Sequence, residues 1–209
     1  MSQYHPTDKA EIRSLYRRMR LSLTPGERSR LSRFACGHVL RSTVWKKASV
    51  VALYVAIKGE TDASGLLEDA WACGKTVLLP VCSADRKGEM RLCPCAGPDA
   101  LRPGLYGIPE PVMPDPVRPE PALTSPTGLS QPPAVVPDLF IVPGVAFTAQ
   151  GHRLGQGGGY YDRLLAAPEF AKATRMGLAY GFQLLPALPE DAWDLPMHAV
   201  ATEKGIIWT

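Results

Sequence analysis

A ten-residue segment from Arg153 to Asp162 combines residue types that bind phosphate. Its sequence is Arg-Leu-Gly-Gln-Gly-Gly-Gly-Tyr-Tyr-Asp, with four glycines in five positions. Glycine lets backbone N–H groups turn toward an anion, and an arginine at the mouth of such a loop can donate two parallel hydrogen bonds to a phosphate. A carboxylate beside a triphosphate usually shares a Mg²⁺ ion with it. The segment therefore predicts a loop that binds a polyphosphate together with a divalent cation.

Two common phosphate-binding motifs do not fit this segment. No Gly-Lys-Ser/Thr follows the glycines, which excludes a Walker A loop. The spacing of Gly155, Gly157 and Gly159, and their late position in the chain, exclude the dinucleotide fingerprint of Rossmann folds. A flexible turn without a binding role is the remaining alternative. The combination of an arginine, two tyrosines and an aspartate with the glycines argues against that alternative.

Apolar runs and amphipathic segments around the loop indicate an α/β sheet. Residues 49–55, 76–80 and 138–142 are β-rich apolar runs typical of strands buried on both faces. A helix predicted over 62–73 and ended by Gly74 joins the first two runs as a βαβ unit, which implies parallel pairing. Further strands are predicted over 175–180 and 199–202, an edge hairpin over 205–208, and a helix from about Tyr160, whose positive end faces the loop. We expect a mostly parallel central sheet flanked by helices in three layers, α/β/α.

The N-terminal part predicts two helices, of which the first is rich in cations. Asp8 followed by Glu11 predicts a helix over 8–21, and Thr24 followed by Pro25 predicts the start of the second. The polar face of the first helix carries Lys9, Arg13, Arg17, Arg18 and Arg20. For the last three arginines we expect a solvated helix face, with attraction of an acidic polyglutamate tail as the alternative.

Length, charge and composition argue against several classes of protein, including nucleic-acid-binding and membrane proteins. The chain has 209 residues with 23 Lys and Arg against 20 Asp and Glu, a formal net charge of +3. This length suits a single domain over 1–209, and so small a charge argues against a nucleic-acid partner. The sequence has no run of 18 apolar residues and no apolar leader, so we expect a cytoplasmic monomer with no membrane partner. Five cysteines without C-x-x-C spacing predict reduced thiols that hold no metal.

Residues 111–137 differ in composition from the remainder of the chain. Nine of these 27 residues are proline, which breaks both helices and sheet ladders. A tolerated proline-rich surface insertion is the prediction, and a lid or a proline-recognition ligand is the alternative.

The segment 153–162 resembles the signature of the 5-formyltetrahydrofolate cyclo-ligases, also called 5,10-methenyltetrahydrofolate synthetases. Further blocks are similar to this family in the same order: Lys9-x-x-x-Arg13, Tyr54-Val55 through Glu60, Gly107-Ile-Pro-Glu-Pro111, and Trp193-Asp194-x-Pro196 with Val200-x-Thr202. Together the blocks span nearly the whole chain outside the proline-rich insertion. Only the glycine loop is specific by itself.

The resemblance implies an enzyme that uses ATP and Mg²⁺ to convert 5-formyltetrahydrofolate, with or without a polyglutamate tail, into 5,10-methenyltetrahydrofolate, ADP and phosphate. The formyl oxygen is phosphorylated, N10 attacks the activated carbon, and phosphate leaves. The implied ATP-binding residues are Lys9, Arg13, Arg153, Leu154, Gly155, Gln156, Gly157, Gly158, Gly159, Tyr160 and Tyr161. The implied folate-binding residues are Val55, Glu60, Tyr160 and Tyr161, with Glu60 accepting hydrogen bonds from pterin nitrogens. Asp162 and Asp194 are implied to hold the metal, and Arg153, Tyr160 and Asp162 to take part in catalysis.

One departure from the family pattern and two rival functions stay open at this point. Many members carry a cationic side chain at one of the positions occupied here by Gln156 and Gly158, so a third cation would come from the first helix. The first rival is a sugar-phosphate isomerase or a coenzyme A transferase-like enzyme on a related fold, which would form no ADP. The second is a non-catalytic folate- or nucleotide-binding protein, which would bind ligand without turnover.

Overall fold

The computed structural model describes residues 8–83, 86, 88–104, 107–111, 135–191 and 193–209. Most of the predicted proline-rich insertion, residues 112–134, lies outside the described residues. The helices are α1 (Lys9–Ser22), α2 (Pro25–Arg41), α3 (Thr43–Lys47), α4 (Ser64–Ala72) and α5 (Tyr160–Leu165). The strands of the main sheet are β1 (Val50–Ala52), β2 (Thr76–Cys82), β3 (Met90–Pro94), β6 (Leu139–Pro143), β9 (Thr174–Leu178), β11 (Ala199–Thr202) and β12 (Gly205–Trp208). Two small sheets consist of β4 (Leu101–Pro103) with β5 (Pro109–Pro111), and of β7 (Ala146–Thr148), β8 (Arg153–Leu154) and β10 (Leu184–Leu185).

The main sheet has the strand order β12-β11-β9-β6-β1-β2-β3. Its five inner strands are parallel, and the edge strands β3 and β12 are antiparallel to their neighbours. The parallel pair β1 and β2, joined through α4, confirms the predicted βαβ unit. From β1 the chain first adds β2 on one side and later adds β6 on the other. Ligands of open α/β sheets bind outside the carboxyl ends of the strands at such a switch point.

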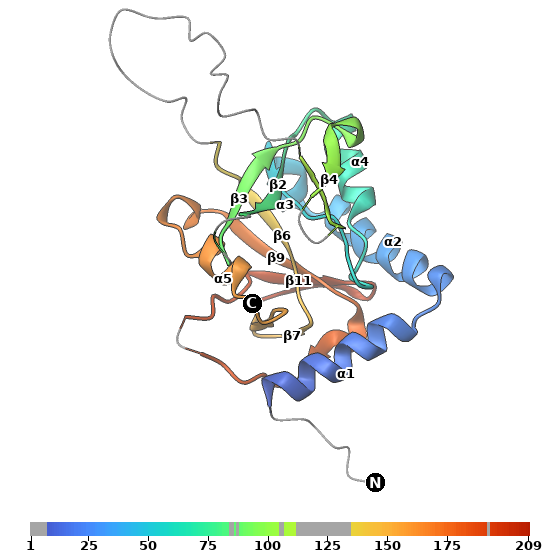
Figure 1. The fold of residues 1–209 in the computed structure, drawn as a ribbon. Coiled ribbons are helices and arrows are strands. Elements are labelled where there is room, and N and C mark those ends of the chain that lie inside the picture. The colour runs from blue at the N-terminus through green and yellow to red at the C-terminus, as the bar shows by residue number, and fades with distance from the viewer. Residues whose placement is uncertain (1–7, 84–85, 87, 105–106, 112–134, 192) are drawn as a thin grey trace, which may run out of the picture.

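Two apolar cores on opposite faces of the sheet confirm the three layers. In β6, Leu139 and Ile141 belong to the core under α2, α3 and α4, whereas Phe140 and Val142 belong to the core under α5. This alternation follows from the strand period of two residues. Figure 1 shows α2 and α4 on one side of the sheet and α5 on the other.

The N-terminal helices begin where the sequence predicts. The side chain of Asp8 accepts hydrogen bonds from the N–H groups of Ala10 and Glu11 and caps α1. Thr24 and Glu27 form a reciprocal capping box at the start of α2. α1 packs its Ile12 into a third apolar cluster with residues of the small sheet that contains β7 and β8. This contact places the basic residues of α1 beside the glycine loop.

Strand lengths and edges differ from the prediction. The first strand ends at Ala52 instead of extending to residue 55. Strand β3 was not predicted, because this antiparallel edge strand carries exposed and partly buried residues and lacks the continuous apolar run of an inner strand. Within the described residues, no helix has the length and apolarity that crossing a membrane requires.

Candidate active site

Four segments that are distant in the sequence enclose a cavity of about 130 Å³. They are the start of α1, the loop after β8, the start of α5 and the segment around residue 194. The cavity is lined by Lys9, Arg13, Arg153, Leu154, Gly155, Gly157, Gly159, Asp162, Asp191, Trp193 and Asp194. Most of the residues expected to bind ATP and metal therefore lie together. Gln156, Gly158, Tyr160 and Tyr161 do not line this cavity.

Arg153 is fixed where the hairpin of β7 and β8 meets the carboxyl end of β6. Its Nη2 donates to Oδ1 of Asp162 at 2.5 Å, and its Nη1 donates to the carbonyl of Pro143 at 3.3 Å. The guanidinium lies 5.6 Å from the ring centroid of Tyr161, and the side chain is 4% exposed. Its Nε has no hydrogen-bond partner among the described residues. Arg153 is therefore fixed by two hydrogen bonds, and its Nε is buried without a partner among the described residues.

Arginines hold the glycine loop through its carbonyl groups. Nε of Arg13 donates to the carbonyl of Gly155 at 2.9 Å, and Nη2 of Arg17 donates to that of Gln156 at 2.7 Å. Gly157 and Gly159 have φ angles of +102° and +65°, which side chains other than glycine rarely adopt. α5 spans only six residues. The helix begins at Tyr160, as predicted, and the side chains of Arg13 and Arg17 also place positive charge beside the loop.

Three carboxylates share the cavity with these cations. Nζ of Lys9 donates to Oδ2 of Asp191 at 2.6 Å and to Oδ2 of Asp194 at 3.0 Å. Burial lowers the pKa of Lys9, but its hydrogen bonds to the two aspartates outweigh burial, and the pKa lies above its usual value. Burial raises the pKa of Asp194, but hydrogen bonds from the N–H of Asp191 and from Lys9 outweigh it, and the pKa lies below its usual value. Both groups are therefore held in their charged forms.

The donor set of this cavity fits a magnesium ion that arrives with a phosphate ligand. Asp162 and Asp194 line the same cavity, but the described residues contain no group of three or more His, Cys, Asp or Glu side chains able to hold a metal. Mg²⁺ at nucleotide sites is bound by one or two carboxylates, with phosphate and water oxygens completing the octahedron. Two aspartates are sufficient for such a site and insufficient for a cage made of protein alone.

Glu60 lies next to the glycine loop, in the segment that follows β1. Its Oε1 accepts a hydrogen bond from Nε2 of Gln156 at 3.2 Å, and its Oε2 accepts one from the N–H of Ile57 at 3.2 Å. Glu60 is 8% exposed, and burial raises the pKa of its carboxyl group. Burial also raises the pKa of Tyr161, and the charge of Glu60 raises it further. Gln156, which the sequence analysis assigned to ATP, thus connects the loop to Glu60. Val55 is partly buried against the core beneath this segment.

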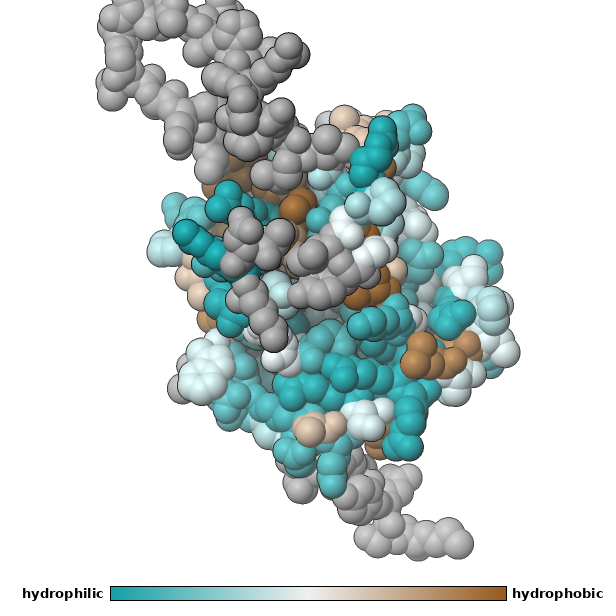
Figure 2. Space-filling view, viewed as in Figure 1, coloured by the Kyte–Doolittle hydropathy of each residue, from teal (hydrophilic) through white to brown (hydrophobic). Residues whose placement is uncertain are grey.

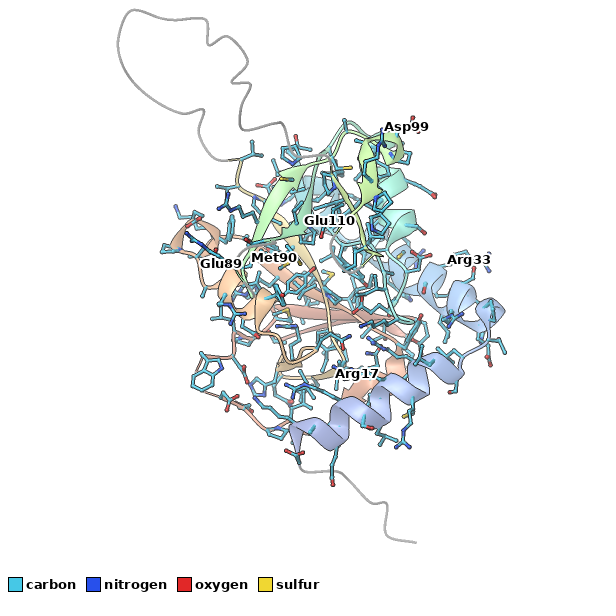
Figure 3. All side chains as sticks on the ribbon, in the orientation of Figure 1. Arg17, Arg33, Glu89, Met90, Asp99 and Glu110 are labelled. Carbon is cyan, nitrogen blue, oxygen red and sulfur yellow. The ribbon has the colours of Figure 1, made fainter. Side chains whose placement is uncertain are left out.

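Several residues of the site were missed or misjudged from the sequence. Asp191 and the 70% exposed Trp193 line the cavity but were given no role. Figure 2 shows hydrophilic side chains gathered over α1, yet the predicted solvated face is wrong for Arg20, which is fully buried. The sequence did contain a signal that Arg20 is buried. Arg20 follows Tyr16 by four residues and Ile12 by eight, and this spacing continues the apolar stripe of the helix. Arg17, labelled in Figure 3, is half-buried and bonded to Gln156.

A larger cavity of about 490 Å³ contains none of the expected site residues. Mainly apolar residues of β3, of α5 and of the segment after α5 line it, including Met90, Leu92, Leu164 and Phe170. Residues 112–134, which precede its lining residue Val135, lie outside the described part of the chain. The polar cavity beside the glycine loop is therefore the candidate active site.

Comparisons with known proteins agree over nearly the full chain. The family model described as the 5-formyltetrahydrofolate cyclo-ligase family matches residues 5–203. The 5-formyltetrahydrofolate cyclo-ligase of Escherichia coli K12 is 33% identical over 192 residues, covering 92% of this chain and 98% of that protein. That of Haemophilus influenzae is 29% identical, covering 92% and 96%. The NMR structure of Aquifex aeolicus 5,10-methenyltetrahydrofolate synthetase has a TM-score of 0.75 at 36% identity, covering 96% of this chain and 92% of that one.

Proposed function

Because the chain belongs to the 5-formyltetrahydrofolate cyclo-ligase family, we propose that it converts 5-formyltetrahydrofolate into 5,10-methenyltetrahydrofolate with ATP at the cavity beside Glu60. One observation carries the placement: the 3.2 Å hydrogen bond from Gln156 to Glu60. It puts a buried carboxylate suited to a pterin directly beside a cationic loop suited to a triphosphate. The two substrates must meet at such a junction for a phosphoryl group to pass between them.

The triphosphate of ATP is bound by the glycine loop together with Lys9, Arg13 and Arg153. These three cations line one small cavity, and Arg153 is held in it by its bonds to Asp162 and to the carbonyl of Pro143. Phosphoryl transfer depends mainly on positioning and on stabilising charge that moves onto the leaving phosphate. Rigid arginines suit this task because they lose little freedom when the charge develops.

The reaction has two steps. The formyl oxygen of the substrate takes the γ-phosphoryl group, and ADP leaves. N10 then bonds to the formyl carbon and gives up its proton, while the carbon–oxygen bond breaks and releases phosphate. The first step needs no general base, because the attacking oxygen carries no proton. The protein's contribution is to orient both substrates and exclude water.

Glu60 selects the folate ring. An ionised carboxylate accepts hydrogen bonds at both oxygens and matches paired N–H donors of a pterin. Each oxygen of Glu60 accepts one hydrogen bond from the protein, so a ligand without those donors would leave the remaining acceptor positions of a buried carboxylate empty, which is costly and gives specificity. Val55, Tyr160 and Tyr161 are proposed to contact the folate on either side of this acid.

Asp162 and Asp194 are proposed to hold Mg²⁺ together with the phosphates. When bound, this ion would neutralise charge on the phosphates. It would also offset the aspartates of the cavity, which otherwise pair with Lys9 and Arg153 and compete with the triphosphate for these cations.

The test is a spectrophotometric assay with ADP analysis. Methenyltetrahydrofolate absorbs near-ultraviolet light that 5-formyltetrahydrofolate does not. We expect absorbance to rise only with protein, ATP and Mg²⁺ together, with one ADP formed per product molecule. Arg153→Met is the matched inactive control, because it keeps an unbranched stem without the charge. An absorbance rise without ATP, or no rise under any condition, would contradict the proposal.

A further inference from the structure

Arg20 is a buried arginine whose charge the mechanism above does not use. It lies in the last turn of α1, and its side chain is 1% exposed. Its Nη1 donates to the carbonyl of Gly144, at the carboxyl end of β6, at 3.2 Å. Its Nε and Nη2 have no hydrogen-bond partner among the described residues. Burying a charged group with two unused donors is unfavourable, so its position calls for a physical reason.

Among the described residues, Arg20 forms an ion pair with the carboxylate of Glu60. Nη1 of Arg20 lies 3.9 Å from Oε1 of Glu60, and the side chain of Glu60 is 6% exposed. Gly59 makes this approach possible, since it has a φ of +73° and a Cβ there would lie 3.3 Å from the backbone oxygen of Arg20. The loop that carries Glu60 is therefore packed against the last turn of α1, with the two charges inside.

The surroundings of Glu60 contain few other groups that favour its negative charge. Its own loop contributes the N–H of Ile57 and the charge of Lys58. The groups that act on it from neighbouring segments are Arg20 of α1, Gln156 of the glycine loop, Tyr161 of α5 and Tyr54 after β1. Burial raises the pKa of Glu60, and Arg20 opposes this more strongly than any other group. The two phenols are buried and neutral, because burial raises the pKa of each.

We propose that Arg20 is a positioning residue that keeps the carboxylate of Glu60 ionised and in place to accept hydrogen bonds from the folate ring. The inference rests on the proposed role of Glu60. A protonated Glu60 would present an O–H donor toward ring N–H donors and would bind the folate poorly. Arg20 acts through Glu60 and touches neither substrate.

The experiment measures the Michaelis constants for folate and for ATP, with kcat, between about pH 5.5 and pH 7.5. The variants are Arg20→Gln, which removes the charge but keeps a donor for Gly144, and Arg20→Lys, which keeps the charge. Arg18→Gln is the matched control, because Arg18 is exposed on the same helix. We expect the folate KM of wild type, Arg18→Gln and Arg20→Lys to vary little with pH. The folate KM of Arg20→Gln should rise about tenfold for each pH unit below the new pKa of Glu60. Its KM for ATP should not change.

Two results would overturn the proposal. One is an Arg20→Gln protein whose folate KM is as independent of pH as that of wild type. The other is a loss that falls equally on kcat and both Michaelis constants at every pH, as a general structural defect would produce. If Arg20→Gln does not fold, the double variant Arg20→Gln/Glu60→Gln decides. A folded double variant supports charge compensation as the role of Arg20, whereas an unfolded one refutes it.

The single variant Glu60→Gln separates this proposal from the proposed function. If Glu60→Gln raises the folate KM but the folate KM of Arg20→Gln does not depend on pH, the positioning role of Arg20 is rejected and the folate role of Glu60 stands. An unchanged folate KM in Glu60→Gln rejects the folate role of Glu60, and the role of Arg20 with it. Wild-type turnover tests the reaction itself and depends on neither outcome.

Discussion

Replacing Asp162 with asparagine tests whether this residue holds a metal or merely anchors Arg153. The pair joins a 4% exposed guanidinium to a 25% exposed carboxylate at 2.5 Å. Asparagine has the same shape and can still accept from Arg153, so we expect the KM for ATP to stay within about threefold, an effect below 1 kcal/mol. Removing one charge-stabilising group costs about 10²- to 10³-fold in kcat. Because solvent screens the charge of a side chain that is one quarter exposed, we expect a loss in kcat at the lower end of this range, about 10²-fold.

The assay is initial-rate absorbance with ATP saturating and Mg²⁺ varied. Because an amide is a weaker ligand than a carboxylate for a hard cation, the Mg²⁺ concentration that gives half of the maximal rate should rise as kcat falls. Asp99→Asn is the control, since Asp99 is exposed and Figure 3 places it at the end of the molecule opposite to Arg17 of α1. An Asp162→Asn protein with kcat within threefold of wild type and an unchanged Mg²⁺ requirement would refute the metal role.

Three further predictions concern other parts of the molecule. Trp193 lines the polar cavity beside the glycine loop, and its side chain is exposed. Trp193→Ala should raise the KM for ATP about tenfold, as loss of base stacking would, with Trp193→Phe intermediate and the folate KM unchanged. Asp138 accepts hydrogen bonds from the N–H groups of Ser49 and Val50, so Asp138→Ala should lower the free energy of unfolding by about 1–3 kcal/mol in urea titrations, with kcat retained. The pKa of Asp194 lies below its usual value, so its stabilising effect is present above about pH 4 and is lost as pH falls through the lower folded value. In Asp194→Asn, the melting temperature should therefore depend less on pH between about pH 2.5 and 4.5 than in wild type. The same pH dependence in both proteins would contradict the lowered pKa of Asp194.

The sequence by itself determined the parallel core, and it predicts a loop that binds phosphate. Residues 76–80 and 138–142 predict inner strands because a strand covered by helices on both faces must be apolar throughout. The glycines and Arg153 indicate phosphate because few other roles need that composition. Local signals of this kind depend on neighbouring residues only, and the structure agrees with them at β2 and β6.

Only the tertiary structure decided which distant side chains meet. Asp191 lies beside Lys9 across 182 positions of sequence, and no local pattern encodes that pairing. Arg20 lies on the apolar stripe of α1, but only the fold shows that the loop of Glu60 covers it and brings an opposite charge to it. Whether a charged side chain is buried depends on which segment packs over it and which opposite charge that segment brings. Both are long-range properties of the fold, and the charges of the site depend on them.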